Sequence, residues 1–250
     1  MRVLCYAQTN IGSGRDNNED NYYCNGTFKR DAAVPVAEAA AEQEGKRLIY
    51  GVFDGMGGEA NGEQAALLCA QTLHQCSSDE PFDALDFFRR ANVAVCDMIA
   101  ASGQVSGSTA ATVHLTGNHA YCCNVGDSRA YRVGAERLER ITRDHSVVEG
   151  LIESGSITAE QARTHPNRNL ITRALGPEEH IECDVYDVTL GADERLLLCS
   201  DGLVVTATDE EMYEAVGRGD TPEESLEHLL ELSKQRGAPD NVTAVLLYQE

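Results

Sequence analysis

One short segment, an apolar run that ends in a carboxylate followed by glycines, constrains the fold of this sequence most. Residues 48–53 are typical of a buried strand, and the run ends at Asp54. Gly57 and Gly58 predict a tight turn, because glycine adopts positive φ without a steric penalty. A helix over 62–73 is expected to follow. A carboxylate at such a strand end can hold a metal ion, but it can equally cap the next helix.

The same arrangement recurs along the chain, which favours the metal reading. Glu19 and Asp20 begin another predicted strand, and three more aspartates stand where a strand meets a glycine or a proline: Asp127, Asp201 and Asp240. Together with the first aspartate, these carboxylates would repel one another strongly at close range unless protons or cations neutralised them. Oxygen-only ligand sets favour hard cations. The cluster therefore indicates Mg²⁺ or Mn²⁺.

Three further side chains admit two interpretations each. Arg15 lies in a polar loop before the Glu19–Asp20 pair, where its guanidinium could clamp a phosphate or form an ordinary salt bridge. His145 and His165 could serve as a general acid or base, although ordinary loop histidines fit the sequence as well. The polar segment over 146–169 that contains His165 predicts a flap or lid.

Composition narrows the choice of partners and location. The 250 residues include 41 acidic and 20 basic side chains, which give a net charge of −21. Such a chain lacks the clustered cations that nucleic acids and anionic membranes require. No apolar run approaches the ~20 residues that span a bilayer, and no secretory signal is evident. The expectation is a soluble cytoplasmic protein in which residues 1–250 form a single domain.

The cysteines are predicted to be structural. There are nine of them, an odd number without a CxxC pair, and most lie in apolar segments such as those around Cys69, Cys96, Cys183 and Cys199. Buried cysteine behaves as a small hydrophobic residue. Reduced thiols are therefore favoured over zinc sites or disulfides. The adjacent Cys122 and Cys123 should point to opposite faces of one strand.

The remaining pattern indicates strands in hairpins, which makes the sheet antiparallel, together with several helices. Strands are predicted over 4–8, 110–115, 120–125, 130–133, 181–188, 195–199 and 242–248. Helices are predicted over 81–101, with Pro81 in the first turn, from Val147, and after the capping residues Thr158, Thr208 and Thr221. Residues 29–46 are expected to form an exposed excursion, partly helical over 37–44.

Taken together, these segments resemble the metal-dependent protein phosphatases of the 2C (PPM) type, in their bacterial branch. The resemblance rests on eight motifs in family order: Arg15-x-x-Asn18-Glu19-Asp20, Val52-Phe53-Asp54-Gly55-Met56-Gly57-Gly58, Gly107-Ser108-Thr109, Val125-Gly126-Asp127-Ser128-Arg129, Thr142-Arg143-Asp144-His145-Ser146, Ile171-Thr172-Arg173-Ala174-Leu175-Gly176, Ser200-Asp201-Gly202-Leu203 and Pro239-Asp240-Asn241-Val242-Thr243. It covers nearly the whole chain. It implies an α+β fold, with a central sandwich of two antiparallel β-sheets, helices on both outer faces in four αββα layers, and a flap subdomain near 146–169.

The resemblance also implies a role for each carboxylate. Asp54 would bridge two tightly held Mn²⁺ or Mg²⁺ ions. The remaining ligands would be Asp201 and Asp240 on the first ion, the Gly55 carbonyl on the second, Glu19 and Asp20 on the second ion or its waters, and Asp127 with Asp201 at a third, weaker ion. Arg15 would hold the substrate phosphate.

The implied activity is hydrolysis of phosphoserine and phosphothreonine in phosphorylated proteins. A hydroxide that bridges the two ions would attack phosphorus in line, because divalent ions lower the pKa of water from 15.7 towards ~7. The resemblance also implies a bacterial Ser/Thr kinase as a functional partner. The alternatives are a non-catalytic regulatory or binding module of the same fold, against which the presence of Asp54, Asp201, Asp240 and Arg15 argues, and a small-molecule phosphoester hydrolase.

Three positions depart from the family pattern. Asn10 stands where many members have Asp, and a structural role is expected there. Met56 stands where some relatives have a histidine that protonates the leaving group, so no side-chain general acid is assigned. Val205 stands where many relatives have an acid at the third metal site, so a third ion should bind weakly or differently.

Overall fold

The computed structural model describes residues 1–57 and 61–249. Its strands are β1 (Arg2–Asn10), β2 (Asp20–Cys24), β3 (Thr27–Phe28), β4 (Val36–Glu44), β5 (Arg47–Met56), β6 (Gly107–Ser108), β7 (Ala110–Thr116), β8 (His119–Val125), β9 (Arg129–Val133), β10 (Leu138–Arg140), β11 (Asp184–Thr189), β12 (Arg195–Cys199) and β13 (Val242–Gln249). Its helices are α1 (Gly62–Cys76), α2 (Ala84–Ser102), α3 (Val147–Glu153), α4 (Ala159–Arg163), α5 (Asp201–Thr206), α6 (Asp209–Gly217) and α7 (Pro222–Gln235).

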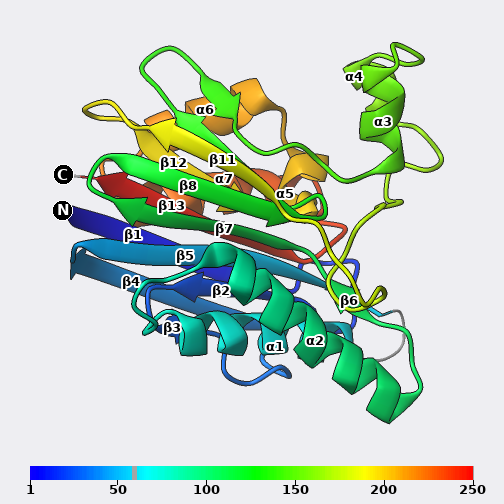
Figure 1. The fold of residues 1–250 in the computed structure, drawn as a ribbon. Coiled ribbons are helices and arrows are strands. Elements are labelled where there is room, and N and C mark those ends of the chain that lie inside the picture. The colour runs from blue at the N-terminus through cyan, green and yellow to red at the C-terminus, as the bar shows by residue number, and fades with distance from the viewer. Residues whose placement is uncertain (58–60, 250) are drawn as a thin grey trace.

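The strands form two antiparallel sheets that face each other (Figure 1). One sheet has the order β10-β9-β12-β13-β1-β4, and the other has the order β11-β8-β7-β5-β2-β3, with β6 beside β5. The first and last strands of the chain are therefore neighbours, with Val3 opposite Gln249. Apolar side chains from the inner faces, such as Val52 and Val245, fill the space between the sheets.

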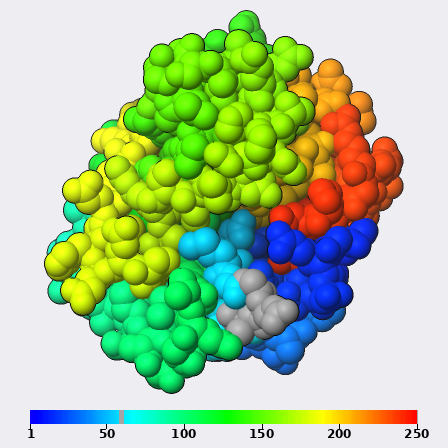
Figure 2. All heavy atoms as spheres, turned by 90° about the vertical axis from the view of Figure 1, so that its right-hand side faces the viewer, coloured from blue at the N-terminus to red at the C-terminus, as the bar shows by residue number. Residues whose placement is uncertain are grey.

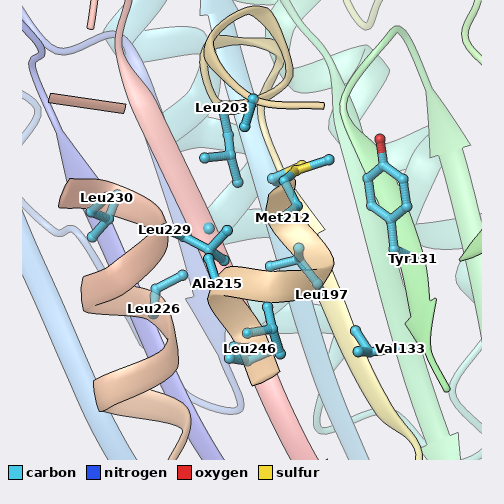
Figure 3. Packing of buried hydrophobic residues seen from close by; sticks show 14 of the residues in the cluster. Tyr131, Val133, Leu197, Leu203, Met212, Ala215, Leu226, Leu229, Leu230 and Leu246 are labelled. Carbon is cyan, nitrogen blue, oxygen red and sulfur yellow. The ribbon is translucent and has the colours of Figure 1, made fainter. Parts of the chain in front are cut away.

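Helices cover both outer faces of this sandwich. α1 and α2 pack on one sheet through buried side chains such as Leu73 and Phe87. α5, α6 and α7 pack on the other, where Leu226 and Leu229 of α7 share a buried cluster with Leu246 of β13 (Figure 3). The predicted four-layer α+β sandwich is confirmed.

The flap stands outside the four layers. α3 and α4 project from one end of the molecule (Figure 1), and an isolated bridge between Ser146 and Ile171 closes their base. Thr158 forms the predicted capping box with Gln161, since its side chain accepts from the Gln161 amide while the Gln161 side chain accepts from the Thr158 amide. The flap predicted near 146–169 is thus confirmed.

Residues 37–44 are not helical, which corrects the sequence-based prediction. They belong to β4, an edge strand that pairs with β1 along its whole length. Alanine and glutamate favour helices locally, but burial alternates here with a period of two residues. Ala37, Ala39 and Ala41 pack against the core between the sheets. Pairing with β1 outweighs a propensity of only a few tenths of a kcal/mol per residue.

Helix and strand ends account for the smaller corrections. α2 begins at Ala84 rather than at Pro81, because the Asp83 side chain accepts hydrogen bonds from the amides of Leu85 and Asp86 and thereby caps the helix. β11 begins at Asp184 rather than at Ile181. Gly58 lies outside the described residues, so its predicted turn is not tested.

Two further sequence predictions concern cysteines and membranes. Cys122 and Cys123 do face opposite sides of β8, because Cys122 packs between the sheets and Cys123 packs against the helices. Cys69 and Cys199 are buried, whereas Cys96 and Cys183 are partly exposed. Over residues 1–57 and 61–249, no helix has both the length and the apolar character to cross a membrane.

Candidate metal centre

The pairing of β2 with β5 places two carboxylates side by side. Asp20 and Asp54 are direct register partners across these antiparallel strands. Like charges in such a position destabilise a sheet unless they are neutralised. Asp20 is buried, and its Oδ2 accepts a hydrogen bond of 2.8 Å from the Ser200 hydroxyl. Ser200 directly follows β12 of the other sheet and is the N-cap residue of α5, so this bond links β2 to the end of a strand in that sheet.

Asp201 and Asp240 approach the same place from the other sheet. Asp201 is the first residue of α5, where the helix dipole favours a negative charge. Asp240 lies in the loop before β13. The charges of both residues act on the carboxyls of Asp20 and Asp54. The structure therefore brings together four of the predicted ligands, which come from four separate segments of the chain.

Glycines allow the loops that carry these carboxylates to touch backbone to backbone. A Cβ on Gly12 would lie 2.1 Å from the Asp240 carbonyl oxygen. A Cβ on Gly202 would lie 1.9 Å from the Asn241 carbonyl oxygen. A Cβ on Gly55 would lie 2.1 Å from the carbonyl oxygen of Gly62 at the start of α1. Any side chain at these glycines would push the loops apart and separate the carboxylates.

Asn241 holds the N-terminal loop in place, a role that sequence reasoning missed. Its Oδ1 accepts from the Glu19 amide at 2.8 Å, and its Nδ2 donates to the carbonyls of Ile11 and Asn17 at 2.8 and 2.9 Å. The sequence shows that Asn241 directly follows Asp240. It does not show that the hydrogen-bond partners of Asn241 lie more than 200 residues away along the chain.

Burial and mutual repulsion raise the pKa values of Asp20, Asp54, Asp127 and Asp201. Burial is the larger cause, and it raises the pKa of Asp20 from 3.8 to about 7 and that of Asp201 from 3.8 to about 6. The pKa values of Asp54 and Asp127 also lie well above 3.8, because neighbouring aspartates add to the effect of burial. The fold thus gathers negative charge that protons or cations must neutralise.

The side chains fit a hard divalent cation. Glu19 is buried, and its Oε1 has no hydrogen-bond partner among the described residues, although a buried carboxylate oxygen ordinarily has one. The donors are all oxygen atoms, as Mg²⁺ and Mn²⁺ prefer. In residues 1–57 and 61–249, no three His, Cys, Asp or Glu side chains come close enough to enclose an ion as they stand.

Arg15 supplies a positive charge at the rim of the cluster. Its Nη2 lies 2.7 Å from Asp240 Oδ2, and its side chain is 47% exposed. The ordinary salt bridge considered for Arg15 is therefore present, but its partner is Asp240 rather than the neighbouring Glu19 or Asp20. An exposed arginine beside a carboxylate cluster can also reach a phosphate that approaches from solvent.

Asp127 lies at the edge of the cluster, in a cleft beneath the flap. A cavity of about 840 Å³ is lined by Asp127, Asp201, Val205 and residues of α3 and α4. Val205 is 46% exposed and offers only methyl groups there. Figure 2 shows this end of the molecule, where the green flap overhangs the adjoining blue N-terminal and red C-terminal segments.

Both histidines accept hydrogen bonds from backbone amides. His145 is buried, and its Nδ1 accepts from the Gly126 amide at 3.1 Å, next to Asp127. Burial lowers the pKa of His145 and favours the neutral ring. His165 Nδ1 likewise accepts from the Asn167 amide at 3.1 Å. The side chain of Asn10 accepts from the Gly12 amide at 3.0 Å and so forms a local turn.

The sequence is similar to known phosphatases over nearly its full length. Residues 6–151 match the family described as Protein phosphatase 2C. A serine/threonine protein phosphatase of Mycobacterium tuberculosis, PstP, is 36% identical over 98% of this chain and 45% of its own length. The serine/threonine phosphatase stp of Listeria monocytogenes is 28% identical over 97% of this chain and 94% of its own. This chain thus spans about half the length of the mycobacterial relative.

Solved structures show the same architecture. The crystal structure of the M. tuberculosis phosphatase PstP superposes with a TM-score of 0.84 at 32% identity, over 100% of both chains. The catalytic domain of that phosphatase, solved in complex with two manganese ions, superposes with a TM-score of 0.81 over 99% of both chains.

Proposed function

Because this chain belongs to the protein phosphatase 2C family, we propose that it is a metal-dependent phosphatase of phosphoserine and phosphothreonine in proteins. One observation carries the proposal. Asp54 lies directly opposite Asp20, and Asp201 and Asp240 converge on both from the other sheet. Relatives with serine/threonine phosphatase names, one of them solved with two manganese ions, support this reading.

The carboxylates would hold two Mn²⁺ or Mg²⁺ ions. Asp54 would contact both, Asp201 and Asp240 would hold the first, and the Gly55 carbonyl would hold the second. Glu19 and Asp20 would bind the second ion directly or through water. When bound, such ions make water nucleophilic near neutral pH and neutralise phosphate charge. Asp127 would contribute to a third, weaker site, where Val205 supplies no ligand.

The remaining steps depend on side chains of this chain. Arg15 would orient the phosphate, since its exposed guanidinium can turn from Asp240 towards solvent. Asn241 and the packed glycines keep the ligand loops in register. Met56 has no proton to give, so we assign no side-chain acid for the leaving serine or threonine oxygen.

The domain extent, the substrates and the location of the protein are proposed by similarity to the family. We propose that residues 1–250 act as one phosphatase domain on phosphorylated protein substrates in the cytoplasm. A bacterial Ser/Thr kinase would supply those substrates. A small-molecule phosphoester hydrolase is the alternative that the same metal centre would also support.

Substitution of Asp54 tests the activity. We expect Asp54→Asn to lower Mn²⁺-dependent hydrolysis of p-nitrophenyl phosphate roughly a thousandfold or more, because the bridging carboxylate is lost. Asp187→Asn, at an exposed position of β11, should leave the rate unchanged. Near wild-type turnover by a folded Asp54→Asn variant would refute the assignment. A panel of phosphoserine, phosphothreonine and phosphotyrosine peptides, beside small phosphoesters, then identifies the substrate class.

A further inference from the structure

Two cysteines face each other across the interior of the sandwich, far from the carboxylates. Cys5 lies on β1 and Cys24 lies on β2, and these strands belong to different sheets. Their sulfur atoms are 2.6 Å apart. Cys5 is 3% exposed and Cys24 is fully buried. This separation is shorter than van der Waals contact between two sulfur atoms and leaves no room for another group.

The backbone permits this approach. Residues of β1 and β2 have Cα atoms within 8 Å of each other, whereas stacked sheets are ordinarily ~10 Å apart. The two sheets therefore come close together where β1 and β2 meet, and the sulfur separation places Cys5 and Cys24 within that contact. Both side chains belong to the same buried cluster, which also contains Tyr22 and Tyr50. Only a small movement separates the two thiols from a covalent bond.

We propose that Cys5 and Cys24 are an oxidisable pair whose disulfide links the two sheets. On oxidation, each thiol loses its proton and a sulfur–sulfur bond forms. The two electrons and two protons convert one external low-molecular-weight disulfide, such as oxidised glutathione, into two thiols. The reaction passes through a mixed disulfide between one cysteine and the external reagent.

Burial decides when the bond can form. Burial is also the main reason why the pKa of Cys5 lies well above 9.0, and the nearby Cys24 raises this pKa further. The thiolate, which is the attacking species, is therefore scarce in the folded protein. The bond should form while the sheets assemble or during local opening, and it should then resist reductants that cannot enter the core.

The pair is separate from the metal centre. Asp20 stands at the start of β2 and Cys24 at its end, so the disulfide would lie away from the proposed ligands. Its effect should be on stability rather than on chemistry. The bond closes a loop between residues 19 positions apart, which restricts the unfolded chain. The proposal does not depend on the proposed function.

Alkylation and mass spectrometry of the whole chain test the proposal. The protein is refolded with oxidised and reduced glutathione, quenched in acid, unfolded and alkylated. We expect two fewer alkylated cysteines than the nine in the sequence, and a cross-linked peptide pair that contains Cys5 and Cys24. Nine alkylated cysteines, or a cross-link elsewhere such as Cys123 to Cys183, would overturn it.

Thermal unfolding supplies a second measurement. The oxidised wild-type protein should unfold several degrees above the reduced protein. Cys24→Ala should abolish both the cross-link and this oxidant-dependent shift. Cys122→Ala, a buried cysteine of the same core cluster, should retain both. An equal shift in Cys24→Ala would contradict the proposal, and the wild-type mass measurement decides the matter even if a variant fails to fold.

Discussion

Arg15 occupies the position of a competing cation in the carboxylate cluster. Its guanidinium is 2.7 Å from a carboxylate oxygen of Asp240, which is also a proposed metal ligand. A divalent ion that binds Asp240 must weaken or displace this ion pair. The same side chain is then available for the phosphate. A single residue can thus link metal occupancy to substrate binding.

Removing Arg15 should separate these two effects. We expect Arg15→Ala to bind Mn²⁺ up to about fivefold more tightly, because an exposed ion pair is worth about 1 kcal/mol or less. Its KM for a phosphopeptide should rise. Titration calorimetry measures the metal affinity, and Arg218→Ala, an exposed arginine paired with Glu214, is the control. Weaker Mn²⁺ binding would show that Arg15 supports the ions instead.

Val205 tests the third metal position. It lies one helical turn after Asp201 in α5 and lines the same cleft as Asp127. Residues i and i+4 share a helix face. We expect Val205→Asp to add an Mn²⁺-binding event in calorimetry beyond those of the wild type, with Val205→Asn as the neutral control. An unchanged stoichiometry would mean that the cleft does not bring these carboxylates together.

At the scale of elements, the flap contacts the body through both of its helices. Glu149 of α3 forms an ion pair with Arg140 of β10. Arg163 of α4 donates from Nη2 to the carbonyls of Val204 and Ala207 at 3.4 Å, at the end of α5. Carbonyls at a helix C-terminus attract such cations. α5 begins at Asp201, so one short helix joins the flap to the metal centre.

Loss of this contact should loosen the flap alone. We expect Arg163→Ala to speed hydrogen exchange across 147–163 several-fold and to leave α7 unchanged, because local opening depends on local contacts. Arg168→Ala, in the same cleft, is the matched control. Hydrogen-exchange mass spectrometry provides the measurement. Equal exchange in the wild type and Arg163→Ala would show that other contacts hold the flap.

At the scale of the whole molecule, the folded state buries carboxyl groups whose ionisation is unfavourable there. The pKa values of Asp20 and Asp201, about 7 and about 6, exceed the 3.8 expected after unfolding. The folded protein therefore binds protons more tightly than the unfolded chain does. The resulting stability is fully present below about pH 4 and is lost as the pH rises through 6 and 7.

The metal-free protein should therefore become less stable between pH 5 and 8, by on the order of a few kcal/mol. Thermal unfolding in EDTA measures this trend, and saturating Mn²⁺ should remove it. Surface charge acts in the same direction, because the net charge is −21. High salt screens surface charge but buried pairs much less. A midpoint that rises with pH in EDTA and high salt would contradict the argument.

Local signals made most of this structure predictable. The strand that leads to Asp54, the capping boxes at Thr158 and Thr208, and the aspartates near strand ends depend on neighbouring residues. The structure places them as expected, except that β5 continues past Asp54 to Met56. β4 was mispredicted because its alanines and glutamates favour a helix until β1 pairs with them. The contact between Cys5 and Cys24 could not be predicted, because the sequence of a strand does not indicate which strand it will face in the opposite sheet.

The sequence by itself determined which oxygen donors this protein offers and that each stands at or near the end of an element. Only the tertiary structure decided which of them meet. Asp20 faces Asp54 because β2 pairs with β5, and Asn241 reaches the Glu19 amide because β13 pairs with β1. These contacts join residues far apart in the chain, and their free energy comes from burying both sheets against the helices. No local pattern specifies them.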